Sequence, residues 1–146
     1  MTIKLQLVRD DRIICEVPLS MGDWRRRDLE DEIDEMRRGL QGFSRVMDAL
    51  GNANRVRMVA HLFEDEDFTL SFKDFIEELG LNPKLVREHT SRLREAGFLD
   101  MPERGKYRLS PIGRIRFLAA GPAMMRILRE LGDQLDINEE SGSTQE

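Results

Sequence analysis

Positively charged side chains are concentrated in one part of this 146-residue chain, although its formal net charge is -5. Residues 82–117 contain nine Lys and Arg and only four Asp and Glu, whereas acidic residues outnumber basic ones both before and after this segment. Clustered Lys and Arg side chains attract polyanions, above all the phosphates of nucleic acids. The charge distribution therefore favours a phosphate-binding surface within residues 82–117.

No combination of residues predicts catalysis or a bound metal. Cys15 is the only cysteine, and with His61 and His89 it provides no set of ligands spaced for zinc. The acidic run EDED at residues 64–67 lacks the spacing and the glycine of a calcium loop, so we interpret it as a solvated connection. Because there is also no nucleophile paired with a base and no glycine-rich phosphate loop, we expect neither an enzyme nor a cofactor.

The elements that must position the basic residues lie within residues 71–99, SFKDFIEELGLNPKLVREHTSRLREAGFL. A first helix is predicted from the capping-box residue Ser71 to the stop residue Gly80. A second is predicted from the cap Asn82 to Gly97, with proline at its first position. Two helices joined by so tight a turn cross steeply, as in a helix-turn-helix that reads DNA.

The next segment, FLDMPERGKYRLS, is typical of a strand, a tight turn around Gly105 and a second strand. Such a hairpin beside a reading helix forms a wing. Arg104, Lys106 and Arg108 would then reach the DNA backbone or the minor groove. A further helix is predicted from the cap Ser110, and Gly121-Pro122 is predicted to separate it from the last helix.

The N-terminal segment, residues 1–20, alternates apolar and polar residues around a polar RDDR and predicts a β-hairpin. An isolated hairpin is marginally stable in water, so we expect its apolar face to lie against the rest of the domain or a partner chain. Cys15 falls on that face, and we interpret it as a buried small hydrophobic residue.

Two long helices are predicted at residues 23–50 and 122–137. The first carries a heptad stripe, which suits packing against the same helix of a second copy or, alternatively, within its own domain. The second carries an apolar stripe that is too wide to leave in water, and together the two helices predict a dimer interface. The expected interface residues are Ile33, Met36, Leu40, Phe43, Met47, Ile127, Leu128 and Leu131. The polar, acidic tail at residues 138–146 is expected to be disordered.

Three segments, VMDALGNANRVRMVAHL, LGLNPKLVREHTSRLREAGFLD and GKYRLSPIGR, resemble winged helix-turn-helix regulators of the ArsR type. The resemblance covers about residues 46–117. It implies a mostly α fold with a small β component (α+β), in which residues 51–120 form the DNA-binding domain, and a homodimer that presents two recognition helices to double-stranded DNA. The metal-sensing cysteines of many relatives are absent, so metal-responsive control is not implied.

The resemblance implies which positions of the recognition helix face DNA, and the wing adds further expected contacts. The recognition helix, residues 83–96, would read the major groove, and the wing, residues 98–109, the backbone or minor groove. The expected contacts are Lys84, Arg87, Glu88, Ser91, Arg92, Arg104, Lys106 and Arg108.

Two functions follow as hypotheses. The first is a dimeric, sequence-specific regulator of transcription, expected in the cytoplasm because the chain has neither a signal peptide nor a membrane-spanning run. The alternative is a winged-helix module that binds proteins and not DNA, which the overall acidity, Leu85 and Glu88 favour.

Overall fold

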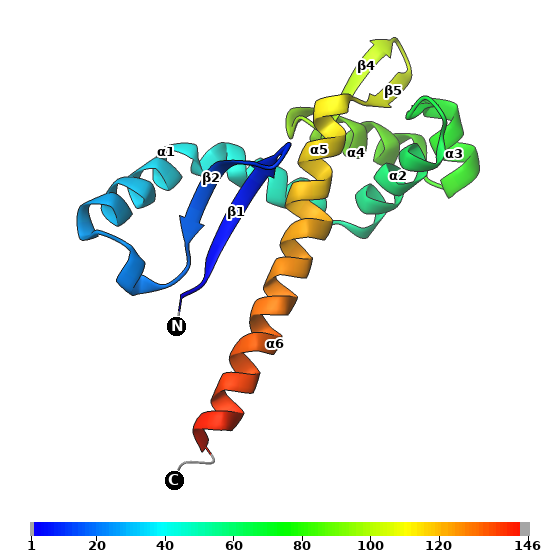
Figure 1. Cartoon of the computed structure of the whole chain (residues 1–146). Coiled ribbons are helices and arrows are strands. Elements are labelled where there is room, and N and C mark those ends of the chain that lie inside the picture. Colours follow the sequence, from blue (N-terminus) through cyan, green and yellow to red (C-terminus); the bar gives the residue numbers. More distant parts are fainter. Residues whose placement is uncertain (1, 144–146) are drawn as a thin grey trace. The chain divides into compact units, whose positions relative to one another are not determined.

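The computed structural model describes the backbone of residues 2–143 and the side chains of residues 2–135. Most of this chain is helical and its strands are short, so the predicted α+β class is confirmed. The chain divides into two compact units, Met1–Gln41 and Gly42–Glu146 (Figure 1). None of the helices in the described residues is both apolar enough and long enough to cross a membrane.

The first unit begins with an antiparallel hairpin of β1 (Lys4–Arg9) and β2 (Arg12–Pro18). Asp10 and Asp11 form its turn, and both have positive φ, as the two central residues of a tight hairpin turn require. Leu7 lies opposite Cys15, and the register shifts directly after Leu7. A short 3-10 helix, η1 (Met21–Asp23), follows, and the Trp24 indole donates to the Pro18 carbonyl oxygen at 2.8 Å.

The hairpin exposes its apolar side chains. Leu7 is 60% exposed and Ile13 is 56% exposed, and Cys15 is also exposed. The interpretation of Cys15 as a buried residue is therefore wrong for the single chain, because no described element covers the face that it shares with Leu7.

The long helix α1 (Arg26–Leu50) begins later than the predicted residue 23, because η1 and the extended residue Trp24 come first. Gly39 and Gly42 lie inside this helix without interrupting it. The part of this helix from Gly42 to Leu50 belongs to the second unit and contributes the buried residue Ala49 to the core of that unit.

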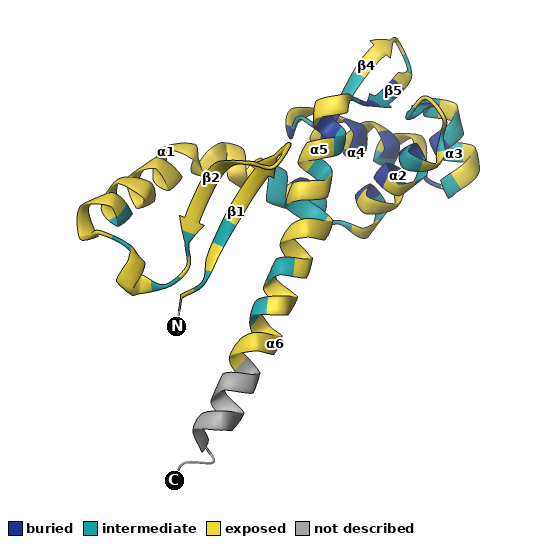
Figure 2. Cartoon of the chain, viewed as in Figure 1, coloured by how far each residue is buried: buried dark blue, intermediate teal, exposed yellow. Residues whose placement is uncertain are grey.

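The second unit has the order of elements of a winged helix-turn-helix. Its helices are α2 (Ala53–Glu64), α3 (Phe72–Leu79), α4 (Pro83–Glu95) and α5 (Pro111–Leu118); its strands are β3 (Thr69–Ser71), β4 (Leu99–Glu103) and β5 (Lys106–Leu109). The strands form an antiparallel sheet in the order β3-β5-β4. Fully buried apolar residues from the helices and the sheet form one core, among them Met58, Leu62, Phe75, Val86, Leu93, Phe98 and Leu109 (Figure 2).

The helix starts that place α3, α4 and α5 are those expected from the sequence. Ser71 and Asp74 form a reciprocal capping box. Asn82 accepts from the Leu85 amide, and Ser110 accepts from the Gly113 amide. Each cap satisfies amides that the first helical turn leaves without partners.

The predicted break at Gly121-Pro122 is wrong. A π-helical turn, η2 (Ala119–Ala123), contains both residues and joins α5 to α6 (Met124–Ser143) without interruption (Figure 1). A π turn interrupts the regular i to i-4 hydrogen bonds, so a proline that lacks an amide proton fits there. The helical backbone continues to Ser143, beyond the expected end at residue 137, and residues 144–146 of the expected disordered tail lie outside the described residues.

The start of α5 lies directly against the strand that begins the wing. A Cβ atom added at Gly113 would lie 2.0 Å from the Phe98 carbonyl oxygen, which is backbone and cannot rotate away. Glycine at residue 113 is therefore required for α5 to approach the wing this closely.

We predict that Gly113→Ala lowers the free energy of unfolding by about 1–3 kcal/mol, because α5 must move away from Phe98. Urea denaturation measures the change. Gly42→Ala is the matched control: a Cβ atom there meets no described atom within 4 Å, so this variant should be unchanged or more stable by roughly 0.5–1 kcal/mol. Equal stability of the two variants would contradict the close approach.

Candidate nucleic-acid interface

Helix α4 has one buried face and one exposed face. The buried face consists of Val86, His89, Thr90 and Leu93. Because these residues recur at helical spacing, the residues between them must face outward. The exposed side presents all five of the α4 residues that the sequence predicted as DNA contacts: Lys84, Arg87, Glu88, Ser91 and Arg92.

The wing is the hairpin of β4 and β5. Glu103 lies opposite Lys106, so Arg104 and Gly105 form the turn, and Gly105 takes a φ of 79° that favours glycine. Pro102 is accommodated because β4 is an edge strand whose register shifts between Asp100 and Glu103. Arg104 and Lys106 are therefore exposed at the end of a short, tightly turned hairpin.

Three of the expected DNA contacts already have acidic partners. Arg108 Nη2 lies 2.7 Å from Asp100 Oδ2 in a two-bonded pair, and this carboxylate raises the pKa of Arg108. Lys106 pairs with Glu103 at 3.4 Å, and Arg92 with Glu88 at 3.9 Å. Arg108 thus links the two wing strands, which is a structural role that the sequence reading missed.

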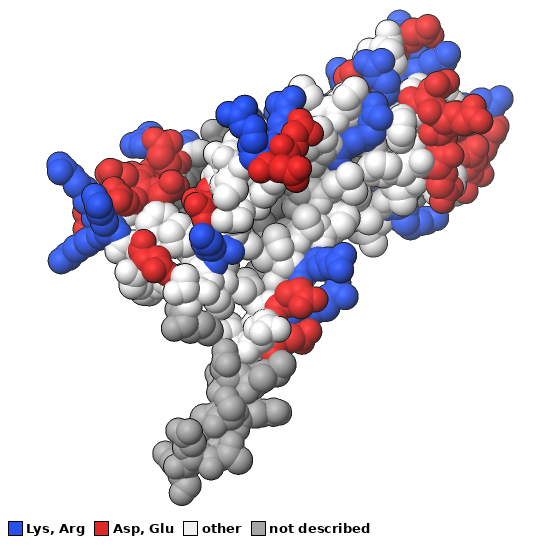
Figure 3. All heavy atoms as spheres, in the orientation of Figure 1, with Lys and Arg blue, Asp and Glu red and all other residues white. Residues whose placement is uncertain are grey.

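On α4 and the wing, four other cations have no such partner. Lys84, Arg87, Arg94 and Arg104 form no ion pair with any residue whose side chain is described. The Arg87 guanidinium lies over the Phe72 ring, 5.6 Å from its centre, which holds it at the start of α4. In Figure 3 acidic side chains gather where α3 lies, whereas basic side chains flank the wing. The free cations are therefore on α4 and at the wing turn.

A shallow pocket lies beside these cations, between α4 and β4. It has a volume of about 470 Å³ and is lined by Ser91, Arg94, Glu95, Leu99, Asp100 and Met101. Its lining mixes both charges with apolar atoms. Of the predicted DNA contacts, Ser91 lines this pocket.

Beneath α4, the sequence reading missed a buried polar cluster. Arg55 is 8% exposed and donates to the carbonyl oxygens of Asp48 and Ala49 at 2.8 Å each. Its Nη1 atom also lies 3.2 Å from Nδ1 of His89, which is 4% exposed. The His89 ring therefore faces the interior and is not on the exposed side of α4. Arg55 lies on the same face of α2 as the buried residues Met58, Val59 and Leu62, and this spacing could have indicated that Arg55 is buried.

Burial lowers the pKa of His89 first, and the neighbouring Arg55 lowers it further. Burial also lowers the pKa of Arg55, and Arg92 adds to this effect. Arginine stays charged in proteins nonetheless, so the pair is stable with His89 neutral. The Nε2 atom of His89 is buried without a hydrogen-bond partner.

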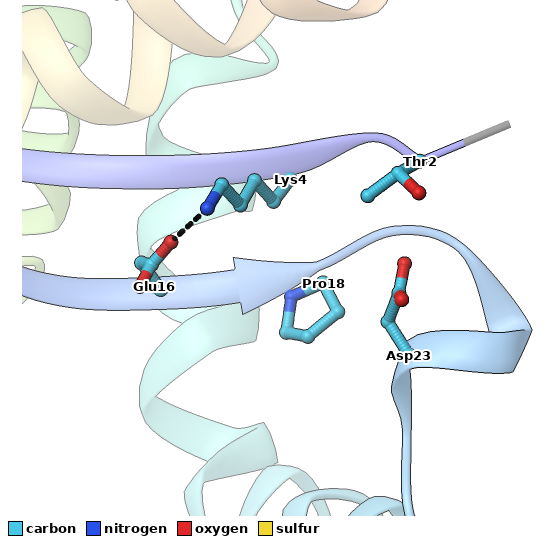
Figure 4. Close-up of a pocket in the computed structure, with 5 residues that line it drawn as sticks. All are labelled: Thr2, Lys4, Glu16, Pro18 and Asp23. Carbon is cyan, nitrogen blue, oxygen red and sulfur yellow. Dashed lines mark ion pairs between the residues drawn. The ribbon is translucent and has the colours of Figure 1, made fainter.

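A second pocket, in the first unit, does not resemble a functional site. It holds about 260 Å³ and is lined by Thr2, Lys4, Glu16, Pro18 and Asp23, with Lys4 and Glu16 paired at 2.7 Å (Figure 4). Among the described residues no group of three or more His, Cys, Asp or Glu could hold a metal ion.

The expected interface residues are exposed or half-buried in the single chain. On α1, Met36 is 59% exposed and Phe43 is 51% exposed, with Ile33 and Leu40 at 45% and 47%. On α6, Leu128 is 61% exposed, whereas Ile127 and Leu131 are half-buried, as is Met47 on α1. Helix α5 also exposes Ile112, Ile115 and Leu118, which were not among the expected interface residues.

Comparisons with known proteins add little. No protein-family model matches the chain, and a search of curated proteins finds no match. A solved structure with a similar fold is a MarR family transcriptional regulator from Streptomyces coelicolor, with a TM-score of 0.47 and 18% sequence identity over 75% of this chain and 82% of that chain. A similarity of this size supports no functional argument, and the expected ArsR type stays a prediction.

We predict that the free energy of unfolding falls as the pH drops below about 6.5, the ordinary pKa of histidine. The unfolded chain then binds a proton at residue 89 that the folded chain, with its lowered pKa, does not bind. Above that pH the contribution is intact. Urea denaturation at several pH values should give a smaller slope for His89→Gln than for the unmodified chain, and equal slopes would contradict the buried neutral ring.

Proposed function

We propose that the chain is a DNA-binding regulator of transcription that uses α4 to read the major groove and the β4–β5 wing to contact the adjacent backbone or minor groove. The observation that carries this proposal is the set of unpaired cations on exposed surfaces of α4 and the wing turn, Lys84, Arg87, Arg94 and Arg104. A helix exposed along one side fits the major groove, and unpaired cations bind phosphates without first losing an ion pair. We also propose that the chain acts in the cytoplasm.

Within this proposal the predicted contacts divide into three kinds. Lys84, Arg87 and Arg104 are available for DNA. We assign Ser91 and Glu88 to contacts with base edges, where a carboxylate accepts from a cytosine amino group, although Glu88 must share itself with Arg92. Arg92, Lys106 and Arg108 must give up or share an acidic partner first, so we assign them a smaller part.

We predict that the chain binds duplexes selected from a random pool and that its affinity falls steeply with salt. Lys84→Ala and Arg104→Ala should each weaken binding and reduce the slope of log affinity against log salt by about one, because each removes one phosphate contact. Lys73→Ala is the matched control, since Lys73 on α3 pairs with Glu77 and lies outside the interface. Fluorescence anisotropy measures all three. Equal effects of the three variants, or affinity independent of salt, would contradict the proposal.

We also propose that the chain acts as a homodimer joined by α1 and the α5–α6 helix. The supporting observation is the exposed stripe Ile33, Met36, Leu40 and Phe43, which runs along one side of α1. The stripe residues are separated by three, four and three positions, and this pattern reads the same from either end of the helix. The stripe can therefore pack on the same stripe of a second copy about a twofold axis. Two subunits would then present two α4 helices to successive turns of the duplex.

We predict that Leu40→Glu converts a dimer into a monomer, because it places a charge in the middle of the apolar stripe. Gln41→Glu adds the same charge one residue away, outside the stripe, and should leave the dimer intact. Sedimentation or light scattering measures the mass of each variant. A monomeric unmodified chain, or a dimer unaffected by Leu40→Glu, would contradict this interface.

A second candidate is a protein-binding winged helix. It is favoured by the ion pairs that neutralise Arg92, Lys106 and Arg108, together with Glu88 on the exposed side of α4. Under this candidate the selection from random duplexes yields no bound DNA.

A further inference from the structure

The best-connected polar side chain inside the second unit joins three helices. Arg55 lies on α2, its Nε and Nη2 atoms donate to carbonyl oxygens of Ala49 and Asp48 in the last turn of α1, and its Nη1 atom contacts His89 on α4. All of these residues belong to the unit Gly42–Glu146. One guanidinium therefore links the end of the long helix to the underside of the exposed helix.

We propose that Arg55 is a positioning residue that holds α4 against the last turn of α1, with neutral His89 as its required partner. This inference rests on the proposed function, in which α4 contacts DNA and α1 joins two subunits. Because the two tasks fall on different helices, the side chain that connects those helices sets where α4 lies relative to the end of α1 within the second unit, which also carries the expected interface residue Met47.

Only arginine suits this position. Its planar guanidinium presents several N–H donors in fixed directions, and here three of its nitrogens contact three different atoms. A lysine ammonium has the charge but not this geometry, and its single nitrogen cannot reach all three partners at once. The carbonyls in the last turn of a helix lack intrahelical partners, and Arg55 donates to two of them, of which that of Asp48 also accepts from the Gly51 amide.

The contact requires His89 to be neutral. Arginine has no acceptor, so Nδ1 of His89 must accept, which leaves the ring proton on Nε2. A protonated ring would lose this hydrogen bond and place two cations in contact.

The other charged groups near the Arg55–His89 pair do not offset the repulsion between two cations. Asp48 on α1 acts on Arg55, and Glu88 and Arg92 on α4 act on both residues. Asp48 is exposed, and Glu88 is paired with Arg92. Among the described residues no carboxylate lies within ion-pair distance of His89. Protonation therefore releases α4 from Arg55.

The first arm of the test needs no DNA. Nitrogen NMR of the full chain at neutral pH should show the His89 ring neutral, with its proton on Nε2, and His61→Gln identifies which signals belong to His89. In Arg55→Gln the pKa of His89 should rise, because a neighbouring cation is removed. A proton on Nδ1 in the unmodified chain, or an unchanged pKa in a folded Arg55→Gln variant, overturns the inference.

The second arm measures affinity for one selected duplex at about pH 7.5 and at an acid pH below the lowered pKa of His89, which the titration in the first arm locates. The unmodified chain should lose roughly tenfold in affinity on acidification, a typical coupling between two linked sites. The opposite trend is the default, since acid makes an acidic chain less negative and so favours DNA.

Two variants show whether a loss of affinity in acid comes from His89. His89→Gln keeps an acceptor for Arg55 that does not titrate, so its affinity should not fall in acid. His61→Gln is the matched control and should lose affinity as the unmodified chain does, because His61 pairs with Glu64 and Glu78 away from this cluster. Equal losses in all three overturn the inference. If no duplex binds at any pH, the proposed function fails, while the first arm still decides whether Arg55 and His89 are in contact.

Discussion

The burial of one face of α4 is the constraint on which the rest of the second unit depends. Val86 and Leu93 are fully buried in the core formed with α2, α3 and the sheet, so rotation of α4 about its own axis would bring them into water. Burying such side chains contributes about 1.5–3 kcal/mol each. This fixes which residues of α4 face outward. Lys84, Arg87 and Ser91 are exposed because their neighbours on the helix are not.

The wing depends on the same core through different residues. Tyr107 and Leu109 of β5 are buried, and the Arg108–Asp100 pair ties β5 to β4 between them. Gly113 lets α5 lie close against Phe98 at the start of this hairpin. As a result, the turn that carries Arg104 projects from a short, well-supported strand pair.

The sequence predicted those elements whose signals are local. The caps Ser71, Asn82 and Ser110 and the stop at Gly80 define helix ends through residues within one turn, and the structure has each of them. The sequence could not predict the partners of charged groups, which depend on tertiary contacts: Arg108 was read as a DNA contact and is paired with Asp100, and Arg55 was not singled out. Gly121-Pro122 was misread because a π turn accommodates a pair that normally ends a helix. The exposure of Cys15 depends on what covers the hairpin, which is not encoded within the hairpin itself.

In the proposed function, the exposed side of α4 and the wing turn together form the DNA-binding surface. Backbone amide NMR of the full chain, recorded while a selected duplex is added, tests it most directly because each residue reports separately. The account predicts that the largest shifts fall on residues 84–94 and 103–106, with α3 changed little. Shifts confined to α3 and the acidic connection before it, or no shift on α4 at saturating duplex, would contradict the claim.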